Sequence, residues 1–244
     1  MNDWQTETDP LVLLNELFPL RTLDSAPHQT RKCRLYLAAC ARRQWDRLPG
    51  VCRALVALAE VCAESPRKAE PIRKVAATVA EGLMHSDGEP DDLHTAALEL
   101  AKANRASVNL ALALRAAPDP LDAVPERSLD ADEWRGLAAL VYLPFVPKTP
   151  PFVWAQAYLS PDLIREIYYN PKTFPLFNSE WRTTDVLAIA RGMYDARAFD
   201  AMPILADALQ DAGCNNADIL DHCRARTQPH VRGCWVLDMV LDPR

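Results

Sequence analysis

The sequence predicts an all-α protein, an irregular bundle of short helices joined by tight turns, which forms either two lobes or one continuous domain. Apolar residues recur at the three- and four-residue spacing of a helix through most of the 244-residue chain. No alternating run of five or more apolar and polar residues marks a strand. There are seven glycines and twenty prolines, alanine and leucine dominate, and β-branched runs are scarce. Together these observations favour helices over strands throughout.

The N-terminal lobe is expected to cover residues 1–125. Its first helix, about 29–48, has apolar residues on one side and basic residues on the other, and Pro49 with Gly50 ends it. Further helical patterns follow at about 51–63, 71–84 and 90–116. Three prolines within residues 117–125 then mark the boundary between the lobes.

The C-terminal lobe is expected to cover residues 126–244 and to consist of shorter helices. Asp130 followed by Glu133 predicts the start of a helix that reaches about Tyr142. The proline-rich segment 144–151 is interpreted as a stiff connector. Side chains that can cap a helix N-terminus precede the next helices: Ser160, Thr183 or Thr184, Asp200 and Asn216. A last helix is expected at about 231–241.

The composition is that of a soluble globular protein. Apolar residues make up 49% of the chain and charged residues 25%. No apolar run approaches the roughly 18 residues that a membrane helix needs, and the N-terminus has no basic and apolar signal pattern. The sequence therefore predicts a cytoplasmic protein that does not enter a membrane. Seven cysteines in such a setting are expected to be free thiols.

Charge is unevenly distributed. Residues 30–53 hold seven cations and one acid, a net charge of +6, so that the rest of the chain carries −12. This asymmetry predicts either an acidic protein partner or pairing between parts of the chain itself. The candidate contact surface consists of four arginines: Arg31, Arg34, Arg42 and Arg43. A pI near 5.4 and few interleaved aromatic residues argue against nucleic acid as the partner.

Cysteine and histidine concentrate in "DAGCNNADILDHCRARTQPHVRGCW", residues 211–235. Zinc takes four nitrogen or sulfur ligands in a tetrahedron. One candidate set for a structural zinc ion, with His222 as an alternative to Cys223, is Cys214, Cys223, His230 and Cys234. His230 and Cys234 are four residues apart and would lie together on one helical turn. The segment has no C-x-x-C pair, and its spacing is not that of a familiar zinc motif.

Two other interpretations of this segment stay open. His230 could activate Cys223 or Cys234 as a nucleophile, although no oxyanion hole or substrate cleft is recognisable. The cysteines could instead be small buried side chains where turns meet helices, with both histidines bonded to backbone groups. Elsewhere there is no phosphate-binding loop and no hydrolase or metalloprotease motif.

The C-terminal region resembles a known family. The run "ARGMYDARAFDAMPILADALQDAGCNNADILDHCR", continued by "PHVRGCWVLDMVLD", is similar to a shared C-terminal segment of bacterial paralogues that are abundant in planctomycete-type genomes. The segment "RKCRLYLAACARRQWDRL" is similar to their usual N-terminal helix. No activity is established for that family, so the resemblance implies a bacterial origin and no mechanism.

The sequence therefore predicts a non-enzymatic helical module for protein interaction or scaffolding, with an acidic protein surface as its partner. The alternative is a metalloprotein or a cysteine-dependent enzyme with its site in residues 214–234. No cofactor other than a structural zinc ion is expected.

Overall fold

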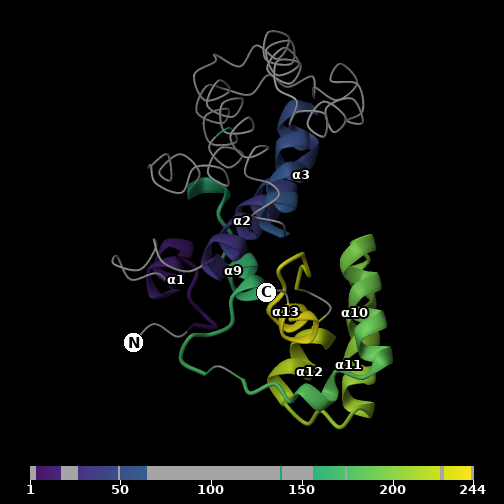
Figure 1. Cartoon of the computed structure of the whole chain (residues 1–244). Coiled ribbons are helices and arrows are strands. Elements are labelled where there is room, and N and C mark those ends of the chain that lie inside the picture. Colours follow the sequence, from purple (N-terminus) through teal and green to yellow (C-terminus); the bar gives the residue numbers. More distant parts are fainter. Residues whose placement is uncertain are drawn as a thin grey trace. The chain divides into compact units, whose positions relative to one another are not determined.

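The computed structural model of the chain describes residues 4–17, 27–48, 50–64, 138, 156–173, 175–225 and 228–242. These residues form eight α-helices and four short 3-10 helices and contain no strand, which confirms the all-α fold class (Figure 1). The helices predicted at 71–84, 90–116 and 130–142 lie outside this part apart from Ala138, as do both proline-rich segments. Among the described helices, none is both long and apolar enough to cross a membrane.

The chain divides into two compact units. Met1–Ser25 and Ser160–Arg244 form unit 1, and Ala26–Leu159 forms unit 2. This division differs from the predicted lobes 1–125 and 126–244, because the first residues of the chain belong with its C-terminal part.

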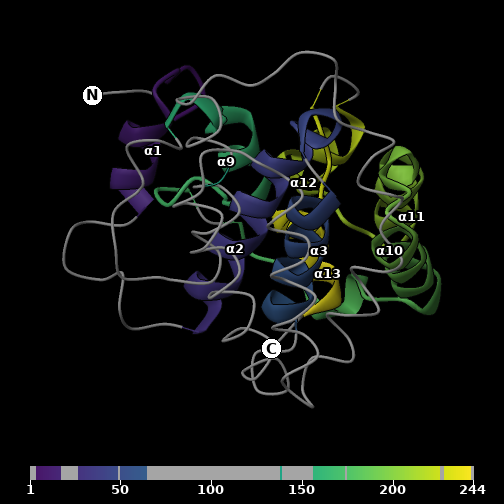
Figure 2. The same cartoon turned by 90° about the horizontal axis from the view of Figure 1, so that it is seen from above.

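In unit 1, a helix from the N-terminal segment packs on a helix from the C-terminal segment. These are α1 (Pro10–Leu17) and α9 (Pro161–Ile167), which lie side by side in Figures 1 and 2. Arg165 on α9 holds the residues before α1, since its guanidinium donates to the backbone carbonyls of Trp4 and Glu7. Leu13 of α1 is fully buried. In the sequence, neither the distribution of charges nor the spacing of apolar residues indicates the contact between α1 and α9.

The remaining elements of unit 1 are short helices: η4 (Ser179–Trp181), α10 (Thr184–Ala196), η5 (Phe199–Ala201), α11 (Met202–Asp211), α12 (Ala217–Arg224) and α13 (Trp235–Leu241). Three predicted caps are confirmed. The side chains of Ser160, Thr183 and Asn216 each accept the backbone N–H three residues on, at 3.3–3.4 Å. The predicted cap Asp200 is wrong, because it lies inside η5 and Ala201 occupies the N-cap of α11.

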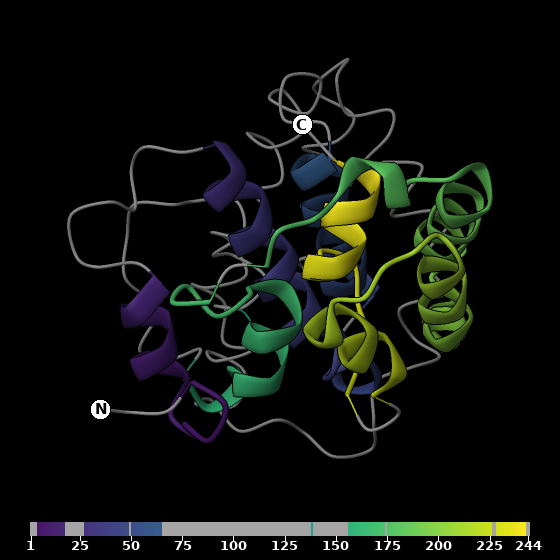
Figure 3. The ribbon, with the colours of Figure 1, turned by 90° about the horizontal axis from the view of Figure 1, so that it is seen from below.

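Helices α10 to α13 enclose one apolar core. Helix α10 packs on α11 and on α13, and α12 packs on α11 and α13; α10 and α11 run side by side in Figures 1 and 3. Each helix contributes apolar residues at helical spacing, but Ile204 of α11, which is expected to point inward, is 60% exposed. The fully buried members include Val186, Ala190, Leu205, Leu209, Ile219, Val236 and Val240.

The last helix begins later than predicted, at Trp235 rather than near residue 231. Val231 to Gly233 form a turn instead, in which the Cys234 backbone N–H donates to the Val231 carbonyl at 3.1 Å. Gly233 has φ +89°, a conformation that favours glycine. Cys234 is therefore the N-cap residue of α13, and its side chain is completely buried.

Unit 2 contains α2 (Pro27–Arg42), η1 (Trp45–Arg47), α3 (Gly50–Glu64) and η3 (Gln156–Tyr158) among its described residues. The predicted helix 29–48 ends at Arg42, and η1 follows it as a separate turn. Helices α2 and α3 pack against each other, and both have buried leucines: Leu35 and Leu37 on α2, Leu55 and Leu58 on α3.

Candidate metal centre

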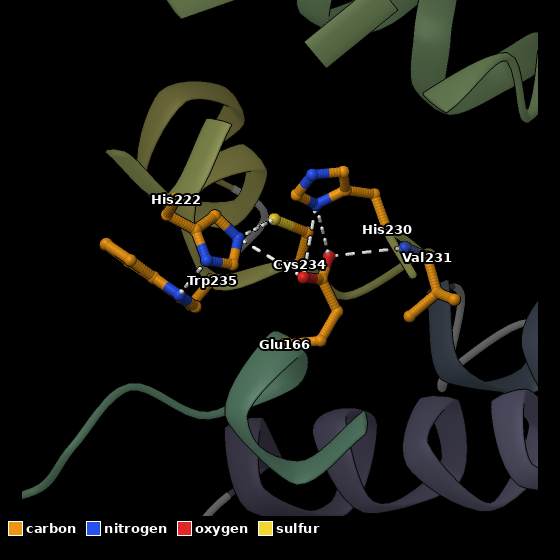
Figure 4. A network of polar contacts seen from close by, with 6 residues as sticks. All are labelled: Glu166, His222, His230, Val231, Cys234 and Trp235. Carbon is orange, nitrogen blue, oxygen red and sulfur yellow. Dashed lines mark hydrogen bonds and ion pairs between the residues drawn. The ribbon is translucent and has the colours of Figure 1, made fainter. Parts of the chain in front are cut away.

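A buried carboxylate organises the polar interior of unit 1. Glu166 lies on α9 and is 0% exposed. Its carboxylate reaches between two histidines, as Figure 4 shows: Oε2 lies 3.2 Å from His222 Nε2 and 3.2 Å from His230 Nδ1. The backbone N–H of Val231 donates to Oε1 at 3.2 Å. Both carboxylate oxygens therefore have nitrogen partners.

These contacts keep Glu166 ionised. Burial alone would raise the pKa of a carboxyl group, but the hydrogen bonds and the electrostatic attraction of His222 and His230 together outweigh it and place the pKa of Glu166 below its ordinary value of 4.5. A buried anion is tolerated only when it is paired or fully hydrogen-bonded, and this one has three N–H groups around it. The negative charge is thus fixed in the interior of unit 1.

Cys234 and Trp235 complete the cluster. The Cys234 Sγ lies 3.2 Å from His222 Nε2, the same nitrogen that faces Glu166. On the other side of the His222 ring, the Trp235 indole N–H donates to Nδ1 at 3.2 Å. The two rings are stacked at a tilt with centroids 4.8 Å apart. His222 is therefore held from both of its nitrogens.

Four side chains of the described residues bring potential metal-ligand atoms together: Glu166, His222, His230 and Cys234, whose ligand atoms all lie within 4.8 Å of one another. Of the residues named from the sequence, His230, Cys234 and the alternative His222 belong to this set. Cys214 and Cys223 do not, although both are buried. His230 and Cys234 meet through the turn before α13 and not on one helical turn.

Glu166 was not recognised from the sequence. It lies 64 positions before His230 in the chain. The sequence feature that could have indicated it is an acidic residue within a short apolar helix. In the structure this helix has seven residues, and Leu163, Ile164 and Ile167 beside Glu166 are all buried. A carboxylate in such a helix needs a cationic, N–H or metal partner.

The arrangement does not suit a nucleophilic cysteine. An activated thiol has a lowered pKa, whereas burial and the nearby Glu166 carboxylate raise the pKa of Cys234 well above its ordinary value. Burial likewise raises the pKa of Cys214 and of Cys223. None of these three thiols has the lowered pKa of an activated nucleophile.

Two cavities flank the cluster. One of about 290 Å³ is lined by His222 and Trp235 together with Tyr169, and the other, of about 650 Å³, is lined by His230 and Cys223. The side chains of His222 and His230 are each only 8% exposed. Each ring thus lines a different cavity.

The basic surface predicted on residues 31–43 is corrected by the structure. Arg31 and Arg34 are 9% and 8% exposed, so they cannot form an open contact surface. Arg31 pairs with Glu64 at 3.0 Å, and Arg42 makes a two-point contact with the buried Glu60 at 2.6 and 3.0 Å. Of the four arginines, only Arg43 is exposed. Arg31 and Arg42 of α2 thus pair with acids of α3, inside unit 2.

Comparison with known proteins adds no assignment: no family model, no curated protein and no solved structure matches this chain.

Proposed function

We propose that unit 1 binds one divalent transition-metal ion, with zinc as the best-suited class, on the cluster of Glu166, His222, His230 and Cys234. The observation that carries the proposal is the convergence of these four ligand atoms within 4.8 Å around a fully buried carboxylate. Imidazole nitrogen, carboxylate oxygen and thiolate sulfur are the three donor types that zinc takes in proteins.

The spacing of the donors supports the proposal. Two ligands on a tetrahedral zinc ion with bonds of about 2.0–2.3 Å lie about 3.3–3.6 Å apart. Glu166 to His222, Glu166 to His230 and His222 to Cys234 are all separated by 3.2 Å. An ion would need these three pairs to move apart by a few tenths of an ångström, and the widest pair of the cluster, within 4.8 Å, to close by about 1 Å.

Charge balance also supports it. A Glu166 carboxylate and a Cys234 thiolate would together neutralise a divalent cation, leaving no net charge in the interior. The raised pKa of Cys234 keeps the thiol protonated without an ion, and a bound cation reverses that preference, because a coordinating thiol is deprotonated. Metal uptake would therefore release a proton, and its affinity would rise with pH.

Metal content tests the proposal. The full chain, purified without a histidine tag, is loaded with zinc, desalted and analysed for metal; one zinc ion per chain is expected. Cys234→Ser should abolish stoichiometric binding. Cys223→Ser is the matched control, since both cysteines are fully buried and only Cys234 is in the cluster. Equal zinc in both variants, or none in the wild type, would refute the proposal.

A stability measurement gives independent evidence. A ligand at 1,000 times its Kd stabilises the folded state by about 4.1 kcal/mol. For a chain of this size that corresponds to a rise in Tm of about 8–16 °C. The rise should appear with zinc, vanish with a chelator, and be absent from Cys234→Ser.

An interaction or scaffold role stays a prediction. The pairing of Arg31 and Arg42 inside unit 2 removes most of the charged surface that motivated it. The expected acidic partner and the cytoplasmic location likewise remain predictions.

A further inference from the structure

The hydrogen bond between Trp235 and His222 fixes which imidazole nitrogen carries a proton. An indole N–H can only donate. Since it donates to His222 Nδ1 at 3.2 Å, that nitrogen presents its lone pair. The proton of a neutral imidazole then lies on Nε2, which faces the Glu166 carboxylate and the Cys234 sulfur at 3.2 Å each. Both of these neighbours can accept, so all three contacts agree with one assignment.

This assignment conflicts with metal ligation by His222. A metal ion would need the lone pair on Nε2, and the ring proton would have to move to Nδ1. A proton on Nδ1 would face the indole N–H of Trp235. Two buried N–H donors would then point at each other, and the indole N–H would lose its acceptor. A histidine that binds a metal normally donates from its other ring nitrogen to an acceptor. Trp235 presents a donor to that nitrogen of His222 instead of an acceptor.

In the part of the chain that the structure describes, no donor opposes the outer nitrogen of His230. Its Nδ1 faces the Glu166 carboxylate, and its Nε2 is buried and has no hydrogen-bond partner among the described residues. Nε2 can therefore take the ring proton when Nδ1 binds a metal ion. The two histidines of the cluster look equivalent in the sequence and differ in this respect.

We propose that Glu166, His230 and Cys234 are the three protein ligands of the metal centre and that His222 is a positioning residue. His222 would donate from Nε2 to the ligating carboxylate and thiolate, with Trp235 fixing its tautomer. The fourth metal position then takes an exchangeable ligand, water or a small monodentate anion. This inference rests on the proposed function, and it places the centre with reactive zinc sites, which keep a position open, rather than with closed structural sites.

The surroundings of the cluster suit an exchangeable ligand. The cavity of about 290 Å³ reaches His222, and the one of about 650 Å³ reaches His230. Both cavities also border Ala225 and Gln228, in the segment that follows α12. A small anion can thus come close to the cluster from either side.

Cobalt(II) substitution of the full chain tests the inference, with azide as the probe. We expect a thiolate-to-cobalt charge-transfer band, which Cys234→Ser lacks, and d–d bands that shift with azide in a saturable way. His222→Gln should keep the cobalt spectrum and lose roughly 10–100-fold in affinity, as expected of an outer partner. His230→Gln is the matched comparison and should lose stoichiometric binding.

The outcomes separate the two proposals. Failure to take up any cobalt or zinc would refute the metal centre itself. Stoichiometric cobalt that does not respond to azide, or His222→Gln losing metal as fully as His230→Gln, would leave the metal centre standing and overturn the three-ligand assignment.

Trp235→Phe provides a second variant that addresses the tautomer directly. Without the indole N–H, the His222 ring is free to carry its proton on Nδ1 and to ligate through Nε2. We expect the azide response of the cobalt form to be lost. A response equal to that of the wild type would overturn the role assigned to Trp235.

Discussion

Replacing Glu166 by glutamine in the metal-free protein is the sharpest test of the buried cluster. The substitution keeps the shape of the side chain, removes its charge, and turns one of its two oxygens into an amide NH₂. That NH₂ would face one of three groups that now donate: the Val231 N–H, His222 Nε2 or His230 Nδ1. The remaining oxygen can satisfy only some of them.

The expected loss in the free energy of unfolding follows from these contacts. Hydrogen bonds to a charged group contribute about 1.5–3 kcal/mol each, neutral ones about 1 kcal/mol, and an unsatisfied buried donor costs about 1–3 kcal/mol. Three weakened contacts with at least one donor left unsatisfied amount to a loss of about 3–5 kcal/mol. Breaking a buried charge pair costs about the same. The corresponding fall in Tm is about 6–20 °C.

The loss of stability is measured by urea unfolding of full-length wild type and Glu166→Gln at several pH values. Unfolding is followed by far-ultraviolet circular dichroism. Because the pKa of Glu166 is lowered below 4.5 in the folded state, its stabilising contribution is fully present above pH 4.5. The contribution is lost as the pH falls through the folded-state pKa. The part of the difference between wild type and Glu166→Gln that the ionised carboxylate contributes should therefore be present in full at pH 7 and shrink as the pH falls below about 4.5.

The control is Glu180→Gln, an exposed carboxylate of the same unit, which should change stability by less than about 0.5 kcal/mol. A loss below about 1 kcal/mol for Glu166→Gln at pH 7 would refute the idea that an ionised Glu166 organises the cluster. A difference that persists undiminished below pH 4 would refute it as well.

Three further outcomes are expected. Burial raises the pKa of Cys52 to about 12, so iodoacetamide at pH 8 should label this thiol only after unfolding, and rapid labelling of the native chain by peptide mass spectrometry would contradict its burial. Asn216→Ala removes the acceptor of the Ile219 N–H and should lower the free energy of unfolding by about 1 kcal/mol, whereas Asn216→Asp should preserve it. Arg42→Lys loses the two-point contact with Glu60 and should cost about 1–3 kcal/mol in urea unfolding; a neutral result would show that the second contact contributes nothing.

The helices of unit 1 could be predicted because their signals are local. An N-cap side chain bonds to a backbone N–H only three residues away, and an apolar stripe repeats within each turn. The residue types alone predict caps at Ser160, at Thr183 or Thr184, and at Asn216, and in the structure Ser160, Thr183 and Asn216 are the caps. Asp200 has the same chemistry, but η5 extends the helical segment ahead of α11 and displaces it from the cap.

The cluster was only partly predictable because its main contacts are not local. The sequence placed His230 and Cys234 together, and it offered His222 only as an alternative. Glu166 comes from a helix 64 positions away, and nothing in the segment 211–235 indicates a carboxylate partner. Cys214 and Cys223 were natural candidates by composition, yet the fold directs them elsewhere in the same core.

The predicted basic surface fails for a related reason. A helical wheel shows which side chains share a face, but it does not show what covers that face. Arg31 and Arg42 both meet acids of the next helix, Glu64 and Glu60. Of the two interpretations of the charge asymmetry, pairing within the chain is seen for Arg31 and Arg42 in unit 2, and an acidic protein partner stays a prediction.

The contact of Arg165 with the carbonyls of Trp4 and Glu7 has a consequence for synthesis on the ribosome. Trp4 is made 161 positions before the arginine that holds it. At about 5–20 residues per second, the residues around α1 wait roughly 8–32 s for α9 to be made. Through that interval the apolar side of α1 has to be kept from other contacts. The residues around α1 are thus synthesised first but reach their native contacts only after α9 has been made. Unit 1 therefore cannot fold in the order in which it is synthesised.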